Sequence, residues 1–447
     1  MKIEIHVHAT RRQKNGLADI SIHFPDLRLK RSLHIFIEKF VALFGQPEPL
    51  ICDLLIVASI VYVIDRSVSR SESEDMWTRN FEARIPVTDP KPWNRIAPEL
   101  SATLSFLSGD VWEISFRNPG CPLFIAPKKK AVVQKRPLSS VNRAVSLFSG
   151  GLDSLAGAID LLERDDSAQV MLVGHTDRSG SGAQQRRLLP IIQEKFGQRA
   201  QLFQMKVDHR PSEALESSSR CRSFLFLAEG IAAATSMGSR VPLFAHENGL
   251  IAINLPLNTA RAGSCSTRTM HPYFLEGMRH ILQGLHLTNP IDNPFALKTK
   301  GECMVGCLNR AVLRKSYLSS VSCAHGTRRR HWKRRKSGNC GYCIPCIFRR
   351  AALHKFSIDD GQQYGLDFCS GEIEPSDDNE SSDDLRAVVD FLRRPRAKDL
   401  LAKAAYRVSP VPSPNDVGDL LNRGYDEVAA LIRAKGTPKL LRASAIK

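Results

Sequence analysis

The chain has 447 residues, 43% of them hydrophobic and 24% charged, so its composition excludes an intrinsically disordered protein and its length predicts two domains and a tail. A formal net charge of +17 implies a field that attracts anions, and charge alone does not choose among nucleic acids, nucleotides and acidic proteins. The longest apolar stretch, residues 54–64, is shorter than the roughly 20 residues of a membrane helix, and the N-terminus lacks a secretory signal, so we expect a cytoplasmic protein without a membrane span.

Residues 1–140 carry the alternating pattern of β-strands. Residues 3–7 and 20–24 alternate apolar and polar side chains on either side of an Asn15-Gly16 turn, which predicts a β-hairpin. Alternation over residues 100–106, and again over 114–116, predicts a second hairpin. The helical candidates are residues 32–44 and 51–64. Together these elements predict an α+β accessory domain.

Strand and helix patterns alternate from residue 141 onward, after a basic linker at 128–136. The predicted strands are 144–148, 170–173, 202–207 and 241–245, and the predicted helices are 154–163, 184–196 and 223–236. This alternation predicts an α/β domain at residues 141–370, with a parallel sheet covered by helices on both faces. Residues 371–447 are predicted to form a mobile acidic linker, from residue 372 to 384, and a helical tail.

A glycine loop, Ser149-Gly150-Gly151-Leu152-Asp153-Ser154, lies where a predicted strand ends and a predicted helix begins. Its glycines allow a tight turn close to an anion, and the helix amides with the Ser149 and Ser154 hydroxyls can donate to phosphate oxygens. Asp153 can hold a magnesium ion or cap the helix. No lysine follows the glycines, so this is not the GxxxxGK(S/T) loop of the common NTPases, and a Gly-Gly turn that binds nothing is the alternative.

Four of the eleven cysteines form a candidate metal site. Cys340, Cys343 and Cys346 form a CxxCxxC motif, and Cys323 lies sixteen intervening residues before it. In a reducing compartment such a cluster reads as metal ligands, and four thiolates close a tetrahedral zinc site with a structural role. An iron-sulfur cluster is the alternative group. The alternative ligands are Cys303, Cys307 and His325.

The glycine loop and the cysteines follow one another as they do in the QueC family of 7-cyano-7-deazaguanine synthases, which the chain resembles over residues 144–355. The loop resembles that family's PP-loop, and residues 340–346 resemble its CGxCxPC cluster. The resemblance implies a Rossmann-like fold of the adenine nucleotide alpha hydrolase type, with ATP, Mg²⁺ and Zn²⁺ as cofactors. It further implies that the enzyme adenylates 7-carboxy-7-deazaguanine with ATP, adds ammonia to give an amide, and then activates the amide again and dehydrates it to a nitrile.

Three shorter segments extend this resemblance: residues 222–227, 246–249 and 298–302. Ser223 stands where the family has an asparagine. The resemblance implies catalytic roles for Asp153, Arg222 and Lys300, ATP binding by Ser149, Gly150, Gly151, Asp153 and Ser154, and substrate binding by Glu247, Asn248 and Arg268. A solvated surface position is the alternative for each of the arginines and for the lysine.

Residues 266–272 and the additional terminal parts are similar to those of the longer QatC-type proteins of bacterial Qat anti-phage systems. This similarity implies protein partners in a defence system, and it implies that a partner-protein amine can take the place of ammonia as the acceptor.

A basic run, residues 328–336, lies between Cys323 and the CxxCxxC motif. As a loop it could follow nucleic-acid phosphates with Trp332 stacked on a base, or it could be a solubilising loop, or one paired with the acidic run. Two other functions therefore stay open: a nucleic-acid-binding defence subunit that uses the PP-loop as a nucleotide sensor, and a PP-loop tRNA-modifying enzyme. The histidines at 6, 8 and 23 lie on the polar side of the predicted N-terminal strands; we expect them to face solvent, and a metal site is the alternative.

Overall fold

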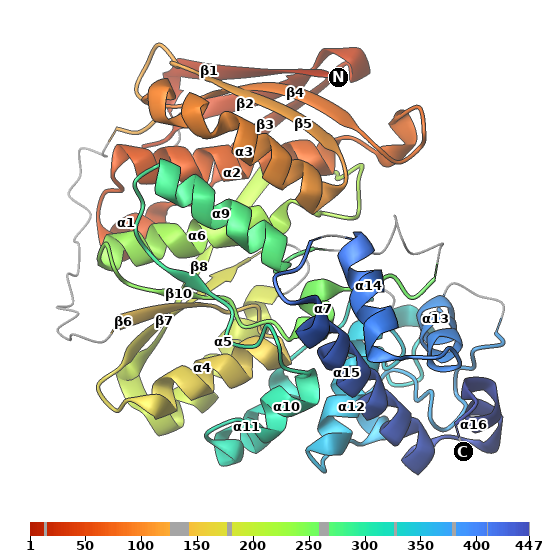
Figure 1. The fold of residues 1–447 in the computed structure, drawn as a ribbon. Coiled ribbons are helices and arrows are strands. Elements are labelled where there is room, and N and C mark those ends of the chain that lie inside the picture. The colour runs from red at the N-terminus through yellow and green to blue at the C-terminus, as the bar shows by residue number, and fades with distance from the viewer. Residues whose placement is uncertain are drawn as a thin grey trace.

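The computed structural model describes residues 1–12, 16–125, 143–176, 181–258, 268–325, 329–377, 381–408 and 410–446. These residues form a mixed α/β fold, about half of it helical, around two sheets (Figure 1). The predicted domain boundary near residue 140 and the predicted linker at 128–136 lie outside the described residues. No described helix is both long enough and apolar enough to span a membrane.

The central sheet is parallel throughout, as predicted. Its strands, in spatial order, are β11 (Ile291–Asp292), β10 (Leu243–Phe244), β6 (Arg143–Leu147), β7 (Gln169–His175) and β8 (Ala200–Met205). The chain builds outward from β6 to β8 and then returns to the other side of β6, so the strand order reverses between β6 and β10. Ligands of open α/β sheets bind at the carboxyl ends of the strands beside such a reversal.

Helices cover both faces of this sheet. On one face lie α4 (Leu152–Arg164) and α5 (Ser181–Phe196), and Val170 and Leu172 of β7 belong to their core. On the other face lies α6 (Arg222–Met237), and Met171 and Val173 belong to its core. Because both faces are buried, the strands read as continuous apolar runs in the sequence. The predicted α/β arrangement is therefore confirmed.

The N-terminal sheet has the order β5-β4-β1-β2-β3-β9. Its first two strands, β1 (Lys2–Arg12) and β2 (Ala18–Phe24), pair antiparallel, which confirms the predicted first hairpin. The remaining strands are β3 (Leu29–Ile35), β4 (Asn80–Pro86), β5 (Val111–Arg117) and β9 (Val207–Arg210). The last of these comes from beyond the predicted boundary and pairs with β3, so the sheet is not made by the first 140 residues alone.

Two predictions in this region are wrong. Residues 100–106 belong to α3 (Pro90–Ser108), because Asp89 caps a helix that begins with proline and Leu100, Leu104 and Leu107 are buried at helical spacing. The predicted helix at 32–44 is strand β3 followed by α1 (Glu38–Phe44). The predicted helix at 51–64 is confirmed inside α2 (Pro49–Ser67).

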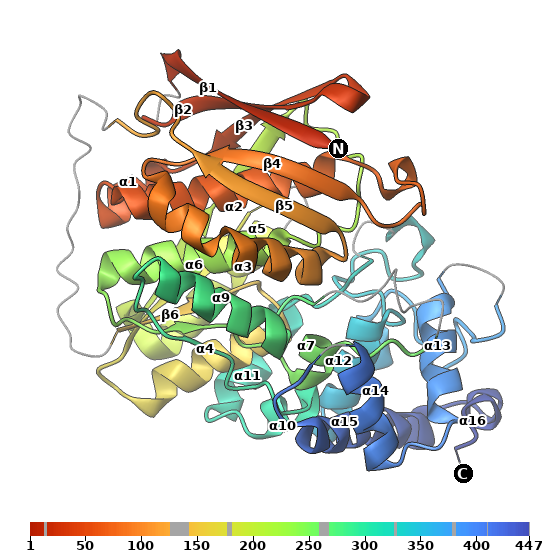
Figure 2. The same cartoon turned by 45° about the horizontal axis from the view of Figure 1, so that its top comes forward.

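The N-terminal elements and the central sheet share one hydrophobic core. Figure 2 shows α3 beside α9 (Pro272–Gly284), and α2 packs against α6. Leu54, Phe224 and Phe274, which are distant in sequence, lie in the same buried cluster. The N-terminal sheet with its helices therefore forms a further layer over the α6 face of the central sheet.

The C-terminal residues form helices around the cysteine-rich segment (Figure 1). These are α12 (Ile344–Lys355), α13 (Asp383–Leu392), α14 (Lys398–Val408), α15 (Pro414–Lys435) and α16 (Pro438–Ser444). The helical tail is confirmed, and described residues of the predicted acidic linker contact the rest of the chain. Glu372 accepts hydrogen bonds from Arg334 at 3.1 Å and from the Asp367 amide at 2.7 Å, and Ile373 is buried.

Candidate functional site

The glycine loop, Ser149–Ser154, connects the end of β6 to the first turn of α4 at the point where the strand order reverses. Gly150 has a φ of +81°, and a Cβ added there would lie 3.3 Å from Gln184 Cβ. Only glycine adopts this left-handed conformation without strain in so little space. The backbone can therefore turn sharply before the helix begins.

Hydroxyl groups surround the amides at this helix N-terminus. Ser149 Oγ lies 3.2 Å from Ser154 Oγ and accepts a hydrogen bond from the Gly151 amide at 3.2 Å. The Leu152 amide donates to Ser322 Oγ at 3.2 Å, a residue that the sequence did not single out. Gly151, at the N-cap of α4, provides no side-chain cap. A helix N-terminus whose own N-cap residue provides no side chain, with three hydroxyls beside it, is a setting that binds anions.

Three predicted residues from three segments converge beside this loop. Asp153 Oδ2 accepts hydrogen bonds from Lys300 Nζ at 2.5 Å and from Asn248 Nδ2 at 2.8 Å. Asn248 is the N-cap of α7 (Gly249–Ile253), and Lys300 is the first residue of α10 (Lys300–Val305). Lys300 is buried, and Asp153 Oδ1 is buried with no hydrogen-bond partner among the described residues.

A residue of the C-terminal helix α15 holds the Lys300 segment in place. Glu427 accepts hydrogen bonds from the Thr299 hydroxyl, from the Gly301 amide at 3.1 Å, and from Lys355 Nζ at 2.8 Å. Thr299 and Glu302 add a reciprocal capping box at the start of α10. The C-terminal part thus positions Lys300, although no local pattern in the sequence points to Glu427.

A cavity of ≈170 Å³ lies next to the glycine loop. Ser149 and Ser154 line it on the loop side, Glu247 lines it after β10, and Arg222 lines it at the start of α6. A cavity of about 150 Å³ is large enough to hold benzene, so this one can hold a planar ring. It brings the predicted loop residues, Arg222 and Glu247 to one place.

Burial changes the acid-base behaviour of two residues after β10. Burial raises the pKa of Glu247 to about 7, and its Oε1 accepts a hydrogen bond from the Thr269 hydroxyl at 2.7 Å. Burial lowers the pKa of His246 to about 3, and its Nδ1 lies 3.2 Å from Ser146 Oγ. Near neutral pH, Glu247 is therefore partly protonated and His246 is neutral.

The raised pKa of Glu247 predicts a pH-dependent stability. The carboxyl ionises near 4.5 when the chain is unfolded and near 7 when it is folded, so its contribution to stability decreases as pH rises through this window. We expect Glu247→Gln to match the wild type at about pH 4.5 and to unfold at a higher temperature than the wild type at about pH 8. Thermal unfolding at both pH values measures this. The same difference between the two proteins at both pH values would contradict the expectation.

The two predicted arginines differ in position. Arg222 is exposed at the cavity, and its guanidinium lies 5.4 Å from the centre of the Phe226 ring. Arg268 instead donates to the Phe106 carbonyl at 2.5 Å and lies over the Phe106 ring at 4.4 Å, away from the cavity. The Arg268 side chain packs against the N-terminal layer, and its predicted substrate contact stays a prediction.

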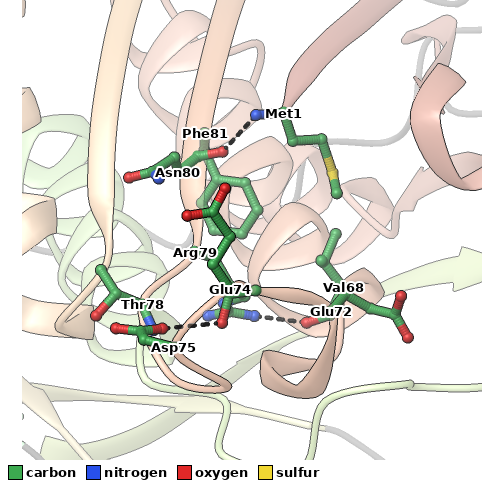
Figure 3. A pocket seen from close by; sticks show the side chains of 10 residues that line it. Met1, Val68, Glu72, Glu74, Asp75, Thr78, Arg79, Asn80 and Phe81 are labelled. Carbon is green, nitrogen blue, oxygen red and sulfur yellow. Dashed lines mark hydrogen bonds between the residues drawn. The ribbon is translucent and has the colours of Figure 1, made fainter.

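Another cavity, of ≈460 Å³, lies at the N-terminal sheet (Figure 3). Exposed carboxylates of Glu72, Glu74 and Asp75 surround it, and the Met1 amino group donates to the Asn80 carbonyl at 2.9 Å beside it. None of the residues predicted to have a function lines this cavity. The candidate site is therefore the smaller cavity at the glycine loop.

The four predicted cysteines form one cluster. The sulfur atoms of Cys323, Cys340, Cys343 and Cys346 all lie within 4.8 Å of one another, and those of Cys340 and Cys346 are 3.7 Å apart. A tetrahedron with Zn–S bonds of about 2.3 Å has edges of about 3.8 Å, so the spacing suits one ion and leaves no room for four irons. The cluster can therefore hold a metal such as zinc.

Backbone amides complete the surroundings of the thiols. Cys323 Sγ accepts from the His325 and Cys340 amides at 3.3 Å each, and Cys340 Sγ accepts from the Cys343 amide at 3.2 Å. Such donors stabilise thiolates around a metal. The alternative ligands Cys303 and Cys307 are buried in the core between α4 and α10, in a different hydrophobic cluster.

The structure of the basic run does not favour stacking of Trp332 on a nucleic acid base. Trp332 is only 2% exposed, and its ring packs against Gly365, so it is not available to a nucleic acid base. Arg334 and Lys333 both pair with Glu372, which is the predicted contact between the basic and acidic runs. Arg328 lies outside the described residues.

Comparisons with known proteins do not identify a family for this chain. No model of a known protein family matches the chain, and no curated protein matches it. The site therefore has to be interpreted from its own residues.

Proposed function

We propose that the chain is an ATP-dependent carbon-nitrogen ligase with a QueC-like PP-loop, which adenylates the carboxylate of 7-carboxy-7-deazaguanine and transfers the acyl group to an amine. The observation that carries the proposal is the N-terminus of α4, with the serine hydroxyls around it, next to a cavity large enough for a planar ring. An ATP phosphate at the loop and a carboxylate in the cavity would then meet at the Ser149–Ser154 wall.

The proposed reaction balances in two steps. A substrate carboxylate oxygen attacks the α-phosphorus of ATP, and pyrophosphate leaves; an amine then attacks the acyl carbon, and AMP leaves. Lys300 and Arg222 supply positive charge for the phosphates and the carboxylate, and the buried, unpartnered Asp153 Oδ1 is an oxygen ligand of the type that Mg²⁺ takes. Ammonia would give the amide; the amide oxygen would then attack a second ATP with release of pyrophosphate, and loss of AMP with that oxygen would give the nitrile. A partner-protein amine would instead give a conjugate, in a setting that we propose to be anti-phage defence.

Observations around the cysteines favour the carbon-nitrogen ligase over the two other functions, a nucleic-acid-binding subunit and a tRNA-modifying enzyme. The burial of Trp332 and the pairing of Arg334 with Glu372 weaken the case for nucleic acid binding by the basic run. The four clustered cysteines leave no thiol of that set to carry sulfur, as tRNA thiolation would need.

The test of the proposed function is AMP release from ATP by the purified protein, with and without 7-carboxy-7-deazaguanine. We expect AMP only when the substrate is present, and at least a 100-fold lower rate in Asp153→Asn, which keeps the side chain's shape and removes its charge. Mass spectrometry of the products identifies the amide, nitrile or conjugate. AMP release in neither condition would overturn the proposal.

A further inference from the structure

Two residues that the sequence analysis did not single out line the inner part of the same cavity. His175 is the last residue of β7, and Glu229 lies in the second turn of α6. His175 Nδ1 and Glu229 Oε1 are 2.8 Å apart, and the two residues are 3% and 1% exposed. The other carboxyl oxygen, Glu229 Oε2, is buried with no hydrogen-bond partner in the part of the chain that the structure describes.

Three proton arrangements fit the shared hydrogen bond. If His175 donates to an ionised carboxylate, or if Oε1 carries the proton and donates to His175, Glu229 Oε2 is an acceptor; if His175 donates to Oε1 and Oε2 carries the proton, Oε2 is a donor. A ligand N–H pairs with Oε2 in the first two arrangements. A buried acceptor that lacks a donor is destabilising, and a ligand N–H at this position would remove that cost.

The other residues that line the cavity favour a ligand with a flat, apolar ring that carries the N–H donor. Phe148, Val173, Phe226 and Met270 line the cavity, and the His175 ring is held between Phe226 at 5.0 Å and Tyr62 at 6.0 Å. The exposed Arg222 is the only cationic arginine or lysine among the described residues that line the cavity. An anionic group on the ligand is therefore best placed near Arg222 and the glycine loop, with the ring inward.

We infer that Glu229, held by His175, is the specificity-determining residue of this site and accepts hydrogen bonds from the N–H donors of a 2-aminopyrimidinone ring. The inference rests on the proposed function, because it takes the ring of the proposed carboxylate substrate as the occupant. The inference goes further than the proposed function because it assigns the exocyclic amine of the ring to Glu229 Oε2. A ring without this amine would leave that acceptor unsatisfied.

The test compares the binding of 7-carboxy-7-deazaguanine with that of its analogue lacking the 2-amino group, by calorimetry and without ATP. We expect the wild type to bind the amino compound roughly 10- to 100-fold more tightly, which corresponds to one buried acceptor left without a donor. We expect Glu229→Met, which keeps the volume and removes the acceptor, to bind both compounds with about equal affinity. The matched control is Glu276→Met on the exposed surface of α9, which should keep the wild-type ratio.

The outcomes separate this inference from the proposed function. Equal binding of the two compounds by the wild type overturns the inference, and this result needs no folded variant. A ratio that survives in a folded Glu229→Met also overturns it. Discrimination by the wild type without any AMP release supports the inference and overturns only the adenylation. Binding of neither compound overturns both.

Discussion

Replacing Lys300 with methionine is expected to slow AMP formation by roughly 100- to 1000-fold, the loss seen when one preorganised charged donor is removed from an active site. Lys300 Nζ lies 2.5 Å from Asp153 Oδ2 in the first turn of α4, and the lysine side chain is 3% exposed. Methionine keeps most of the length of the side chain but removes the charge beside the proposed phosphate site. It also leaves the partly buried Asp153 carboxylate without its cation, which costs further stability.

The control is Lys298→Met, because Lys298 lies two positions earlier and its Nζ lies over the Phe295 ring at 5.4 Å instead of at Asp153. We expect this variant to keep AMP formation within about threefold of the wild type. Thermal unfolding of both variants shows whether a loss of activity comes from an unfolded protein or from the missing lysine in a folded one. A folded Lys300→Met that forms AMP at the wild-type rate would show that Lys300 has only a structural role.

The central sheet and its loop were predictable because their signals are local. Residues 170–173 form an unbroken apolar run since both faces of β7 are buried, and the glycine loop follows β6 directly in sequence. Asn248 and Lys300 were predicted from short motifs, and they do converge on Asp153. The sequence could not supply the reason for this convergence, which is the reversal of strand order between β6 and β10.

The errors arose where a local pattern fits two structures. Residues 100–106 alternate as a strand does, yet Leu100 and Leu104 also share one face of a helix, and the cap at Asp89 decides the outcome. Strand β9 is only four residues long, and its place beside β3 depends on a pairing between distant segments. No periodicity in a single sequence records such a pairing.

Several site residues were not found because their roles depend on distant contacts. Glu427 contacts Thr299 and Gly301 from a distant part of the chain. In the sequence, Glu229 is only a charged residue within a mostly apolar predicted helix. Glu229 gains a role only when its carboxyl group is seen buried beside His175 in the cavity wall. Arg268 lies in a matching motif, but its side chain packs against Phe106 and does not line the cavity, so its role in substrate binding stays a prediction.

Replacing Cys343 with serine is expected to lower the midpoint of thermal unfolding by roughly 10 °C or more and to reduce bound zinc from about one ion per chain to almost none. Cys343 is buried among the other three cysteines and is the N-cap of α12, which packs on α15. Loss of the metal would leave three thiols that repel one another when ionised and would release the segment that contains Cys323. Metal analysis and thermal unfolding measure the two effects.

The same variant should weaken ATP binding, although no cysteine of the cluster lies in the glycine loop. Ser322 precedes Cys323, and its hydroxyl accepts the hydrogen bond from the Leu152 amide at the start of α4. A metal held by the four cysteines would therefore fix one hydroxyl of the proposed phosphate site, and we expect its loss to weaken ATP binding about tenfold. Cys369→Ser is the matched control, because Cys369 is equally buried in the same hydrophobic cluster but is not one of the four. Unchanged zinc content in Cys343→Ser, or an equal loss of ATP binding in Cys369→Ser, would contradict this coupling between the metal and the loop.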